Sequence, residues 1–555
     1  MSVASIDPVR LGLIWHRLDG VVDQVAETFV RAAFSVVVRD NYDMAFSLFD
    51  ARGCQLTQSK RSIPSFMGTL PRTLQAVLEK FPLASLEPGD TIITNNAWIG
   101  TGHLNDISMV HPIFRENRIV AFAASTAHTV DIGGAPQPAA RDCFEEGLCI
   151  PICKIVVRGE ENPLVIDLLR ENLRQPDETL GDIRAQFAAY RDCAKKLLEI
   201  MHEEGLEELE HVADEIITRS ERGMRSAIEK LPDGEYSDGF TVDGVDEPLH
   251  IQCLVRINGG ELEVDFAGTS PQVHWPINSV LNYTQAYGSY AVKCLLDPGA
   301  PSNAGSVAPL TITAPPGCLL NATPPAPVWG RHLSGHYVPP AIFGALAPIL
   351  PGQVIAESGS PLWNVYFSGT RQSRGQGQGN SQSGGERFVK MFFMNGGHGA
   401  RANSDGPGCL SFPSNVSNQP IEAFEHQVPL LATEKSFVPD TGGGGKFRGG
   451  NAQRIGFVSR SKTPITMTIR HERVTYPPRG LLGGLDGSAG LDLVNGKVIA
   501  AKSRSELQEG DHVVFQTPGG GGLFAPSQRS RELIEEDLKS GLVTREQTEK
   551  VYGDE

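Results

Sequence analysis

The sequence predicts a mixed α+β protein of several domains, with an N-terminal α/β domain, a helical middle region and a glycine-rich, β-dominated C-terminal part. Its 555 residues exceed what one simple core fills. Long helical patterns gather between 162 and 232, and alternating, strand-like patterns begin near 236. The 60 glycines and 38 prolines concentrate in the last two thirds, which favours β-structure with many turns.

These changes of pattern suggest five parts. We expect the N-terminal α/β domain over 1–160 and the helical region over 161–235. A mixed α/β domain, a β-rich domain and a C-terminal helix then follow over 236–385, 386–525 and 526–555.

Apolar residues at helical spacing predict helices over 7–38 and 71–82. Pro71 suits the first turn of the second of them. Short apolar runs bounded by turn residues predict the strands of this part. They cover a hairpin over 44–58, a buried strand over 91–94 and a second hairpin formed by 109–114 and 119–127.

The middle region carries long helical patterns over 182–204 and 206–231, with charge pairs four residues apart. From 236 onward the alternation changes to a period of two, which predicts a hairpin around Asn258-Gly259-Gly260. The remaining expectations are helices over 275–300 and 335–349, a strand over 306–313, a polar loop over 368–385 and a final helix over 526–550 that packs onto another part of the chain.

The charge and the hydropathy exclude two classes of partner. A net charge of −16 argues against nucleic acid. No apolar run approaches the roughly 20 residues of a membrane helix, so no membrane partner is expected. The N-terminus has an early Asp7 and lacks the long apolar core of a secretory signal. We expect a cytoplasmic protein.

A cluster of metal-type ligands is the main chemical signal. His103 and Asp106 lie three residues apart in a glycine-rich turn, and His128 and Asp131 repeat that spacing after the next hairpin. The hairpin would bring the two sets to one end of a sheet. Two imidazoles and two carboxylates suit a divalent metal. The alternative is structural: the aspartates cap turns and the histidines are satisfied in the core.

Three glycine clusters raise the question of a phosphate site. They lie at 395–399, 441–450 and 518–522. The second ends in Lys446, but Phe447 stands where a P-loop needs a hydroxyl residue, and strand rather than helix follows. Tight turns and close backbone packing explain these glycines, with a backbone nest for an anion as the alternative. If ATP is used, we expect another subunit to bind it.

Several longer motifs resemble those of the hydantoinase B family. The similarity runs from about residue 6 to residue 553. The N-terminal motifs are Asp43 with Leu48-Phe49-Asp50, Gly102-His103-x-x-Asp106, His128-x-x-Asp131-Ile132-Gly133-Gly134, Glu145-Glu146-Gly147-Leu148 and Gly181-Asp182-x-Arg184-x-Gln186. The later ones are Val264-Asp265-Phe266-x-Gly268-Thr269-Ser270-Pro271, Asn303-x-Gly305, 443–450 and 517–522.

This family includes the B-type component of ATP-dependent N-methylhydantoinase, the B half of 5-oxoprolinase and the alpha subunit of acetone carboxylase, and it is related to caprolactamase-type lactamases. The resemblance implies a hetero-oligomer in which an A-type subunit with an actin-like ATPase fold uses ATP and Mg²⁺ to phosphorylate the substrate. The B-type subunit then completes the reaction, with a divalent metal (Zn, Mn or Fe) in those members that hold one.

The resemblance also implies a set of ligands. By position they are Asp40, His103, Asp106 and His128, with Asp40 standing where many members have Glu. Asp131 is expected to orient a histidine. Glu145 or Glu146 is a candidate general base, with capping as the structural alternative.

The chain departs from the family pattern in two places. Ser62 and Phe66 replace the histidines of a His-Ile-Pro-Val-His-Leu-Gly segment, which makes that region more apolar. Asn96 stands where an aspartate is usual.

Three functions compete. The first is the B-type subunit of an ATP-dependent hydrolase of a cyclic amide: a hydantoin, a lactam or 5-oxoproline. The second is a subunit of an ATP-dependent ketone carboxylase of the acetone or acetophenone type, for which the chain is short. The third is a non-catalytic structural subunit, which intact metal-type ligands argue against.

Overall fold

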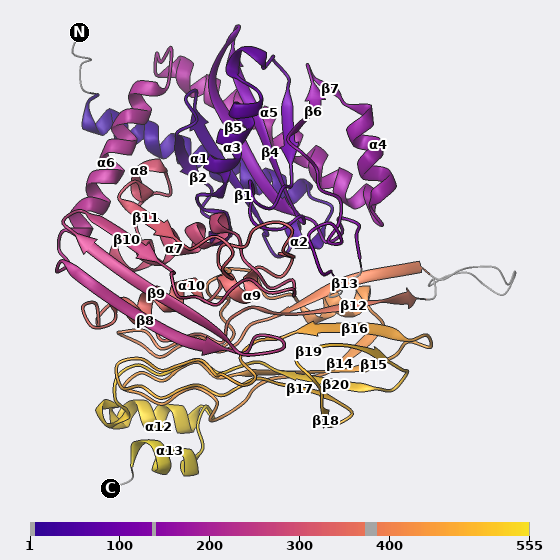
Figure 1. Ribbon diagram of the computed structural model, residues 1–555, viewed down its shortest axis with the longest axis vertical. Coiled ribbons are helices and arrows are strands. Elements are labelled where there is room, and N and C mark those ends of the chain that lie inside the picture. The colour runs from indigo at the N-terminus through magenta and orange to yellow at the C-terminus, as the bar shows by residue number, and fades with distance from the viewer. Residues whose placement is uncertain (1–5, 136–139, 372–385, 554–555) are drawn as a thin grey trace, which may run out of the picture. The chain divides into compact units, whose positions relative to one another are not determined.

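A computed structural model describes residues 6–135, 140–371 and 386–553 of the protein (Figure 1). Its contacts group the chain into two compact units. Unit 1 contains 1–236, 253–267 and 271–338, and unit 2 contains 237–252, 268–270 and 339–555. Helices and strands are mixed along the chain, as the sequence predicts. The division into five parts remains a prediction.

Unit 1 is built on a seven-stranded antiparallel sheet in the order β2-β1-β5-β4-β3-β6-β7. Its strands are β1 (Met44–Asp50), β2 (Gln55–Gln58), β3 (Thr91–Thr94), β4 (Asp106–Arg115), β5 (Arg118–His128), β6 (Cys153–Val157) and β7 (Glu160–Glu161). The helices that accompany it are α1 (Pro8–Ala32), α2 (Val36–Arg39), α3 (Thr69–Lys80), α4 (Pro163–Asn172), α5 (Pro176–Glu203) and α6 (Glu210–Ile228).

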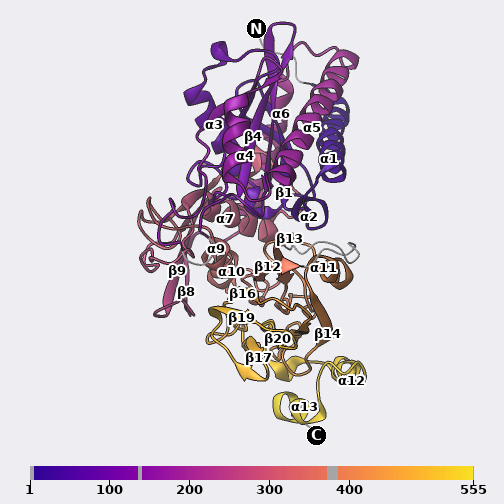
Figure 2. The same cartoon turned by 90° about the vertical axis from the view of Figure 1, so that its right-hand side faces the viewer.

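Helices cover both faces of this sheet. Helices α1 and α5 pack on each other and on the sheet, and α3 contacts β4 and β5 from the other side (Figure 2). The buried face of α1 includes Leu11, Ile14 and Leu18, and each such side chain contributes about 1.5–3 kcal/mol by leaving water. Because both faces are covered, most residues of β4 and β5 are buried, including polar ones such as Ser108 and Thr126.

The helix expected over 7–38 is two helices. The carboxylate of Asp182, on α5, accepts hydrogen bonds from the backbone N–H groups of Phe34 and Ser35 at 2.6 and 3.2 Å. Ala33 is extended, and Ser35 then caps α2 through the N–H of Val38 at 3.3 Å. A tertiary contact therefore interrupts a pattern that is helical by periodicity alone.

The helix expected over 275–300 is shorter than predicted. The observed helix is α7 (Leu281–Leu296). Before it, Asn278 holds an irregular segment, because its side chain accepts the N–H of Val273 and donates to the carbonyl of Pro327. The next helix, α8 (Ala304–Val307), and the strand β11 (Leu310–Thr313) divide the strand expected over 306–313, and α9 (His332–Gly335) and α10 (Val338–Leu346) divide the helix over 335–349.

The hairpin expected near 258 is present. It joins β9 (Leu249–Asn258) to β10 (Glu261–Asp265) in a sheet of the order β11-β10-β9-β8, where β8 is Gly234–Val242. The chain passes between the two units within β8 and β9.

Unit 2 holds two further sheets, in the orders β13-β12-β16-β19 and β14-β15-β20-β17-β18. Trp363 and Phe457 of these sheets and Phe424 of the neighbouring helix belong to one core. The strands are β12 (Trp363–Arg371), β13 (Glu386–Met394), β14 (Leu430–Phe437), β15 (Gln453–Ser459), β16 (Ile465–Arg470), β17 (Leu491–Val494), β18 (Lys497–Val498), β19 (Lys502–Leu507) and β20 (His512–Gln516), and α11 (Ile421–Gln427) packs beside them. The polar loop expected over 368–385 lies outside the described residues from 372 onward, and its first four residues belong to β12.

The glycine clusters of unit 2 pack backbone against backbone. Gly443 donates to the carbonyl of Gly520, and Gly520 donates to the carbonyl of Gly450, at 2.8 and 2.9 Å. A Cβ on Gly397 would lie 1.9 Å from the oxygen of Gly450. Close backbone packing, rather than an anion nest, therefore accounts for these glycines.

The C-terminal helix expected over 526–550 is two helices, α12 (Arg531–Lys539) and α13 (Arg545–Tyr552). Gly541, at a φ of +67°, lies in the turn between them. The carboxylate of Asp537 accepts two hydrogen bonds of 3.0 Å from Arg448, which lies in the second glycine cluster. This confirms that the C-terminal segment packs onto another part of the chain.

Within the described residues 6–135, 140–371 and 386–553, no helix has both the length and the hydrophobicity that a membrane span requires.

Candidate metal site

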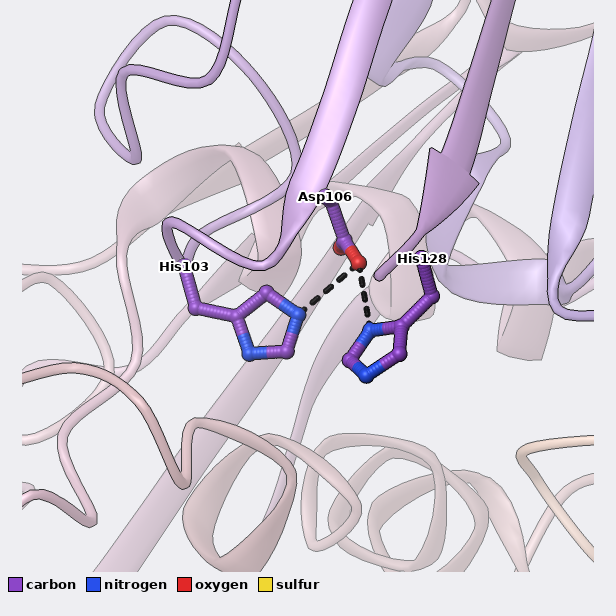
Figure 3. Close-up of side chains that lie close together, drawn as sticks. All are labelled: His103, Asp106 and His128. Atoms are coloured by element: carbon purple, nitrogen blue, oxygen red, sulfur yellow. Dashed lines mark hydrogen bonds and ion pairs between the residues drawn. The ribbon is translucent and has the colours of Figure 1, made fainter. Parts of the chain in front are cut away.

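The ends of two neighbouring strands place the candidate ligands Asp106 and His128 side by side. Strand β4 begins at Asp106, strand β5 ends at His128, and the register pairs these two residues directly across the hairpin. Directly opposed residues carry their Cβ atoms roughly 5 Å apart on one face. His103 lies three residues earlier, in the turn that leads into β4. Figure 3 shows the three side chains converging.

One carboxylate oxygen is the centre of the cluster. Oδ1 of Asp106 lies 2.8 Å from Nε2 of His103 and 2.8 Å from Nδ1 of His128. One ligand atom from each residue can be chosen so that all three lie within 4.8 Å of one another. All three residues are buried. The structure therefore brings together three of the four ligands that the sequence suggests.

Arg331 binds the other oxygen of the same carboxylate. Its Nη2 lies 2.6 Å from Oδ2 of Asp106, and its Nε donates to the carbonyl of Thr101 at 2.6 Å. The guanidinium also lies over the ring of Tyr283, 4.4 Å from the centroid. Gly102 makes room for this arginine, because a Cβ at that position would lie 2.6 Å from Cδ of Arg331.

The charges around Asp106 keep it ionised. Burial by itself would raise the pKa of this carboxyl. The charge of Arg331 and the hydrogen bond from Nδ1 of His128 are among the interactions that oppose burial and hold the pKa well below its usual value.

The tautomer of His103 is set by its second nitrogen. Nδ1 of His103 lies 2.9 Å from the backbone carbonyl of Trp329. A carbonyl only accepts, so Nδ1 carries the proton. Burial, followed by the charge of Arg331, lowers the pKa of His103 to about 4, which keeps the ring neutral at pH 7. Nε2 is then an unprotonated lone pair.

That lone pair faces a negative oxygen. Nε2 of His103 is 2.8 Å from Oδ1 of Asp106, yet it has no hydrogen-bond partner of acceptable geometry. Two acceptors in contact repel each other unless a cation lies between them. The donor set of two imidazole nitrogens and one carboxylate oxygen fits a divalent transition metal.

A second carboxylate lies beside His128. Oδ2 of Asp43 is 4.0 Å from Nδ1 of His128. Burial raises the pKa of Asp43 to about 6. Burial would lower the pKa of His128, but the nearby charge of Asp43 and the hydrogen bond to Asp106 outweigh burial and raise it.

Asp40, the fourth ligand expected from the resemblance, is not part of the three-residue cluster. It follows α2 directly, where its backbone N–H donates to the carbonyl of Val36 at 2.8 Å. Its carboxylate pairs with Nε of Arg39 at 3.0 Å, and the side chain is partly exposed.

Asp131 has a different set of partners from the one expected. Its carboxylate accepts hydrogen bonds from the backbone N–H groups of Gly133 and Gln175, each at 3.1 Å, and from Nη1 of Arg174 at 2.9 Å. These bonds hold the turn that follows β5 against the start of α5.

The two candidate general bases differ in their environments. Glu145 is exposed, and its Oε2 accepts the backbone N–H of Arg141 at 2.8 Å. Glu146 is only 1% exposed. Its Oε1 accepts the backbone N–H groups of Val328 and Trp329 at 2.7 and 2.6 Å, and the carbonyl of this same Trp329 holds His103.

Sequence reasoning did not single out Trp329, Arg331 or Tyr283. Arg331 is separated from Asp106 by 225 residues, and no local sequence pattern predicts such a contact. Asp43 belongs to one of the motifs shared with the family, and no role was expected for it. Phe66, which replaces a family histidine, is fully buried in the 3₁₀ helix Pro64–Phe66.

Comparison with known proteins finds relatives that match most of this chain. The family model described as hydantoinase B/oxoprolinase matches residues 7–526. A protein of Pseudomonas sp. (strain NS671), assigned as the B component of a D-/L-hydantoinase, is 31% identical over 583 residues, which cover 100% of this chain and 96% of that protein. The 5-oxoprolinase 1 of Arabidopsis thaliana is 26% identical over 93% of this chain, but this region is 42% of its own length.

Two solved structures share the fold. The ATP-dependent caprolactamase from Pseudomonas jessenii has a TM-score of 0.87 at 24% identity, and the alignment covers 99% of this chain and 96% of that chain. An acetone carboxylase in its nucleotide-free state has a TM-score of 0.85 at 19% identity, and the alignment covers 99% of this chain and 80% of that chain.

Proposed function

The chain belongs to the hydantoinase B/oxoprolinase family, and on that premise we propose that it is the B-type subunit of an ATP-dependent hydrolase of a cyclic amide. The substrate is a hydantoin, a lactam or 5-oxoproline. An A-type ATPase subunit activates this substrate, and the present chain completes the ring opening at its metal site.

The chemistry requires activation before water can attack. The nitrogen lone pair of a cyclic amide is delocalised into the carbonyl, so the carbon is a poor electrophile. Phosphorylation of the carbonyl oxygen by the ATPase subunit makes the carbon electrophilic. In the B-type subunit a water adds to that carbon, and the C–N bond breaks as the ring nitrogen takes up a proton. The acyl phosphate that results is then hydrolysed by a second water to the carboxylate and phosphate.

The observation that carries the proposal is the unprotonated Nε2 of His103, 2.8 Å from the ionised carboxylate of Asp106. A divalent metal held there would supply a Lewis acid that lowers the pKa of the attacking water. His103, Asp106 and His128 would hold this cation, while Arg331 balances the second oxygen of Asp106. Burial of the cluster excludes bulk water and strengthens these interactions.

Two carboxylates are candidates for the fourth donor. Asp40 comes from the family resemblance. Asp43 comes from its position 4.0 Å from Nδ1 of His128. The general-base role expected for Glu145 or Glu146, and the orienting role expected for Asp131, stay predictions.

The alternative is a carboxylase, in which bicarbonate rather than water is the second reactant. The hydrolase is favoured by the 31% identical hydantoinase component, whose length is matched almost completely. A requirement for bicarbonate separates the two reactions.

Metal content tests the site itself. We would measure Zn, Mn and Fe by elemental mass spectrometry in the purified wild type and in His103→Ala. About one metal per chain in the wild type, lost in the variant, is the expected result. If neither protein holds a stoichiometric metal after ions are supplied, the metal-assisted mechanism is wrong.

Activity tests the reaction class. The chain would be reconstituted with a purified A-type subunit and given a hydantoin, a lactam or 5-oxoproline with ATP and Mg²⁺. Ring opening that depends on both subunits and not on bicarbonate is expected. ATP-dependent consumption of a ketone with bicarbonate, without ring opening, would support the carboxylase instead.

A further inference from the structure

Glu146 is a buried carboxylate whose hydrogen bonds reach the segment 328–329. Its carboxylate is 1% exposed, and one oxygen, Oε1, accepts two consecutive backbone N–H groups, those of Val328 and Trp329. Hydrogen bonds from backbone amides to a buried carboxylate are stronger than bonds between neutral groups. They fix the course of the chain at 328–329.

The same short segment provides the acceptor for His103. The carbonyl of Trp329 lies 2.9 Å from Nδ1 of His103. Trp329 thus donates its N–H to Glu146 and offers its carbonyl to His103. A displacement of this residue would remove the acceptor that keeps the proton on Nδ1.

We propose that Glu146 is a positioning residue that selects Nε2 of His103 as the metal-binding nitrogen, through the backbone of Trp329. The inference rests on the proposed metal site. Partners of this kind, which orient a ligating histidine through its other nitrogen, set the tautomer and the ring orientation of the histidine. Here the orienting group is a carbonyl, and the carboxylate acts one step behind it.

The loop around Glu146 is built to hold this position. The N–H of Leu148 donates to the carbonyl of Ile132, and the N–H of Ala135 donates to the carbonyl of Glu145, both at 2.8 Å. Gly147 has a φ of +143°, and a Cβ there would lie 2.5 Å from the oxygen of Ile132. The two glycine-containing motifs around 131–134 and 145–148 therefore form one tightly packed support.

A further hydrogen bond ties this support to the segment that it orients. The N–H of Cys143 donates to the carbonyl of Pro325 at 2.9 Å. Residues 143–146 and 325–329 are thus joined at both ends, which prevents the Trp329 carbonyl from turning away from His103.

The test compares three substitutions at one position. Glu146→Ala removes both hydrogen bonds, Glu146→Asp shortens the side chain by one methylene, and Glu146→Gln keeps a carbonyl oxygen that accepts the same two N–H groups. Glu145→Ala, at the exposed neighbour, is the matched control. Affinity for Co²⁺ would be measured by competition with a chromophoric chelator.

We expect Glu146→Ala to weaken Co²⁺ binding about 10–100-fold, as is typical for partners behind a ligating histidine. Glu146→Asp should also weaken it, Glu146→Gln should retain most of the affinity, and Glu145→Ala should match the wild type. In ¹H NMR of the Co²⁺ form, the hyperfine-shifted, exchangeable N–H signal of His103 should be present in the wild type and the Gln variant. It should be lost to solvent exchange in Glu146→Ala, a change that a general loss of stability would not produce.

The outcomes separate the two proposals. If the wild type binds no Co²⁺, the proposed metal site is wrong, whatever Glu146 does. If the wild type binds and a folded Glu146→Ala binds equally well with the same N–H signal, the positioning role is wrong. If Glu146→Ala does not fold, the other two variants decide: equal affinities of Glu146→Asp and Glu146→Gln would also overturn the role.

Discussion

Nη2 of Arg331 lies 2.6 Å from Oδ2 of Asp106, on the side of the carboxylate away from the two histidines. This contact gives the two oxygens different roles. Oδ2 is neutralised by the guanidinium, while Oδ1 faces His103 and His128. Asp106 can therefore remain ionised inside the protein and still direct one oxygen at a cation.

The first prediction follows from this division. Replacing Arg331 with Met keeps much of the volume but leaves the charge of Asp106 buried and unbalanced. We expect a loss of about 3–5 kcal/mol in the free energy of unfolding of unit 1, together with weaker metal binding. Chemical denaturation and metal titration would measure both. Arg118→Met, at an exposed pair with Glu208, should leave both unchanged.

The second prediction concerns the fourth donor. Asp43→Asn should weaken metal binding more than Asp40→Asn, because Asp43 lies 4.0 Å from Nδ1 of His128 whereas Asp40 pairs with Arg39. The loss expected for a group at the metal is about tenfold or more. Isothermal titration with Mn²⁺ or Zn²⁺ compares the two variants. The opposite order would establish the assignment to Asp40.

A third prediction tests the packed loop behind the site. Gly147→Ala combines a positive φ with a Cβ 2.5 Å from the oxygen of Ile132, so the loop has to move. Gly159→Ala has a φ of +89° but open space around its Cβ, and it should cost only the roughly 1–2 kcal/mol of a left-handed conformation. Metal affinity should fall in the first variant and not in the second. Equal affinities would show that the loop does not support the site.

The fourth prediction concerns the C-terminal helices. Asp537, on α12, binds Arg448 and also lies 2.6 Å from Nη2 of Arg529. Asp537→Asn removes the carboxylate charge that the buried Arg448 pairs with, while Arg529 keeps its ion pair with Asp405, and the change should destabilise unit 2 by about 3–5 kcal/mol. Calorimetry would show this as an earlier transition. The exposed Asp177 gives the control, since Asp177→Asn should not change that transition.

The fifth prediction concerns acid stability. Burial opposes ionisation of Glu357, but the charges of Arg473 and Arg479 outweigh burial and lower the pKa of Glu357 below its ordinary 4.5. The unfolded chain then takes up a proton more readily than the folded one. The stabilisation is therefore complete above about pH 4.5 and is lost as the pH falls through the lower pKa of the folded state.

Measured as the free energy of unfolding against pH, Glu357→Gln should lower stability near neutral pH, because it removes the buried negative charge that Arg473 and Arg479 share. It should also flatten the decline below pH 4.5. Glu509→Gln, at an exposed position, should keep the wild-type curve. If the free energy of unfolding of Glu357→Gln declines below pH 4.5 as it does in the wild type, another group controls the acid stability.

The convergence of His103, Asp106 and His128 could be read from the sequence because it depends on local geometry. Two apolar runs joined by a short turn form a hairpin, and the ends of a hairpin lie opposite each other. The roles of Trp329 and Arg331 could not be read in this way. Their contacts cross more than 200 residues, and nothing in the local sequence of 328–331 marks them.

The same distinction explains the errors in helix length. Periodicity located α1 and α2, but the break between them comes from Asp182, which lies about 150 residues later and captures two backbone N–H groups. The start of α7 depends in the same way on the hydrogen bonds of Asn278. The glycine clusters could be assigned to close packing by their composition, but the segments that they pack against could not be named.

The dependence of the site on 328–331 has a consequence for synthesis on the ribosome. His128 leaves the exit tunnel 203 residues before Arg331, an interval of roughly 10–40 s at ordinary translation rates of about 5–20 residues per second. During this time the nascent chain displays both histidines and Asp106 without the guanidinium or the carbonyl that orders them. A cation that bound at this stage would meet ligands that are not yet held in place. We therefore expect selective metal binding only after residues 328–331 have been translated.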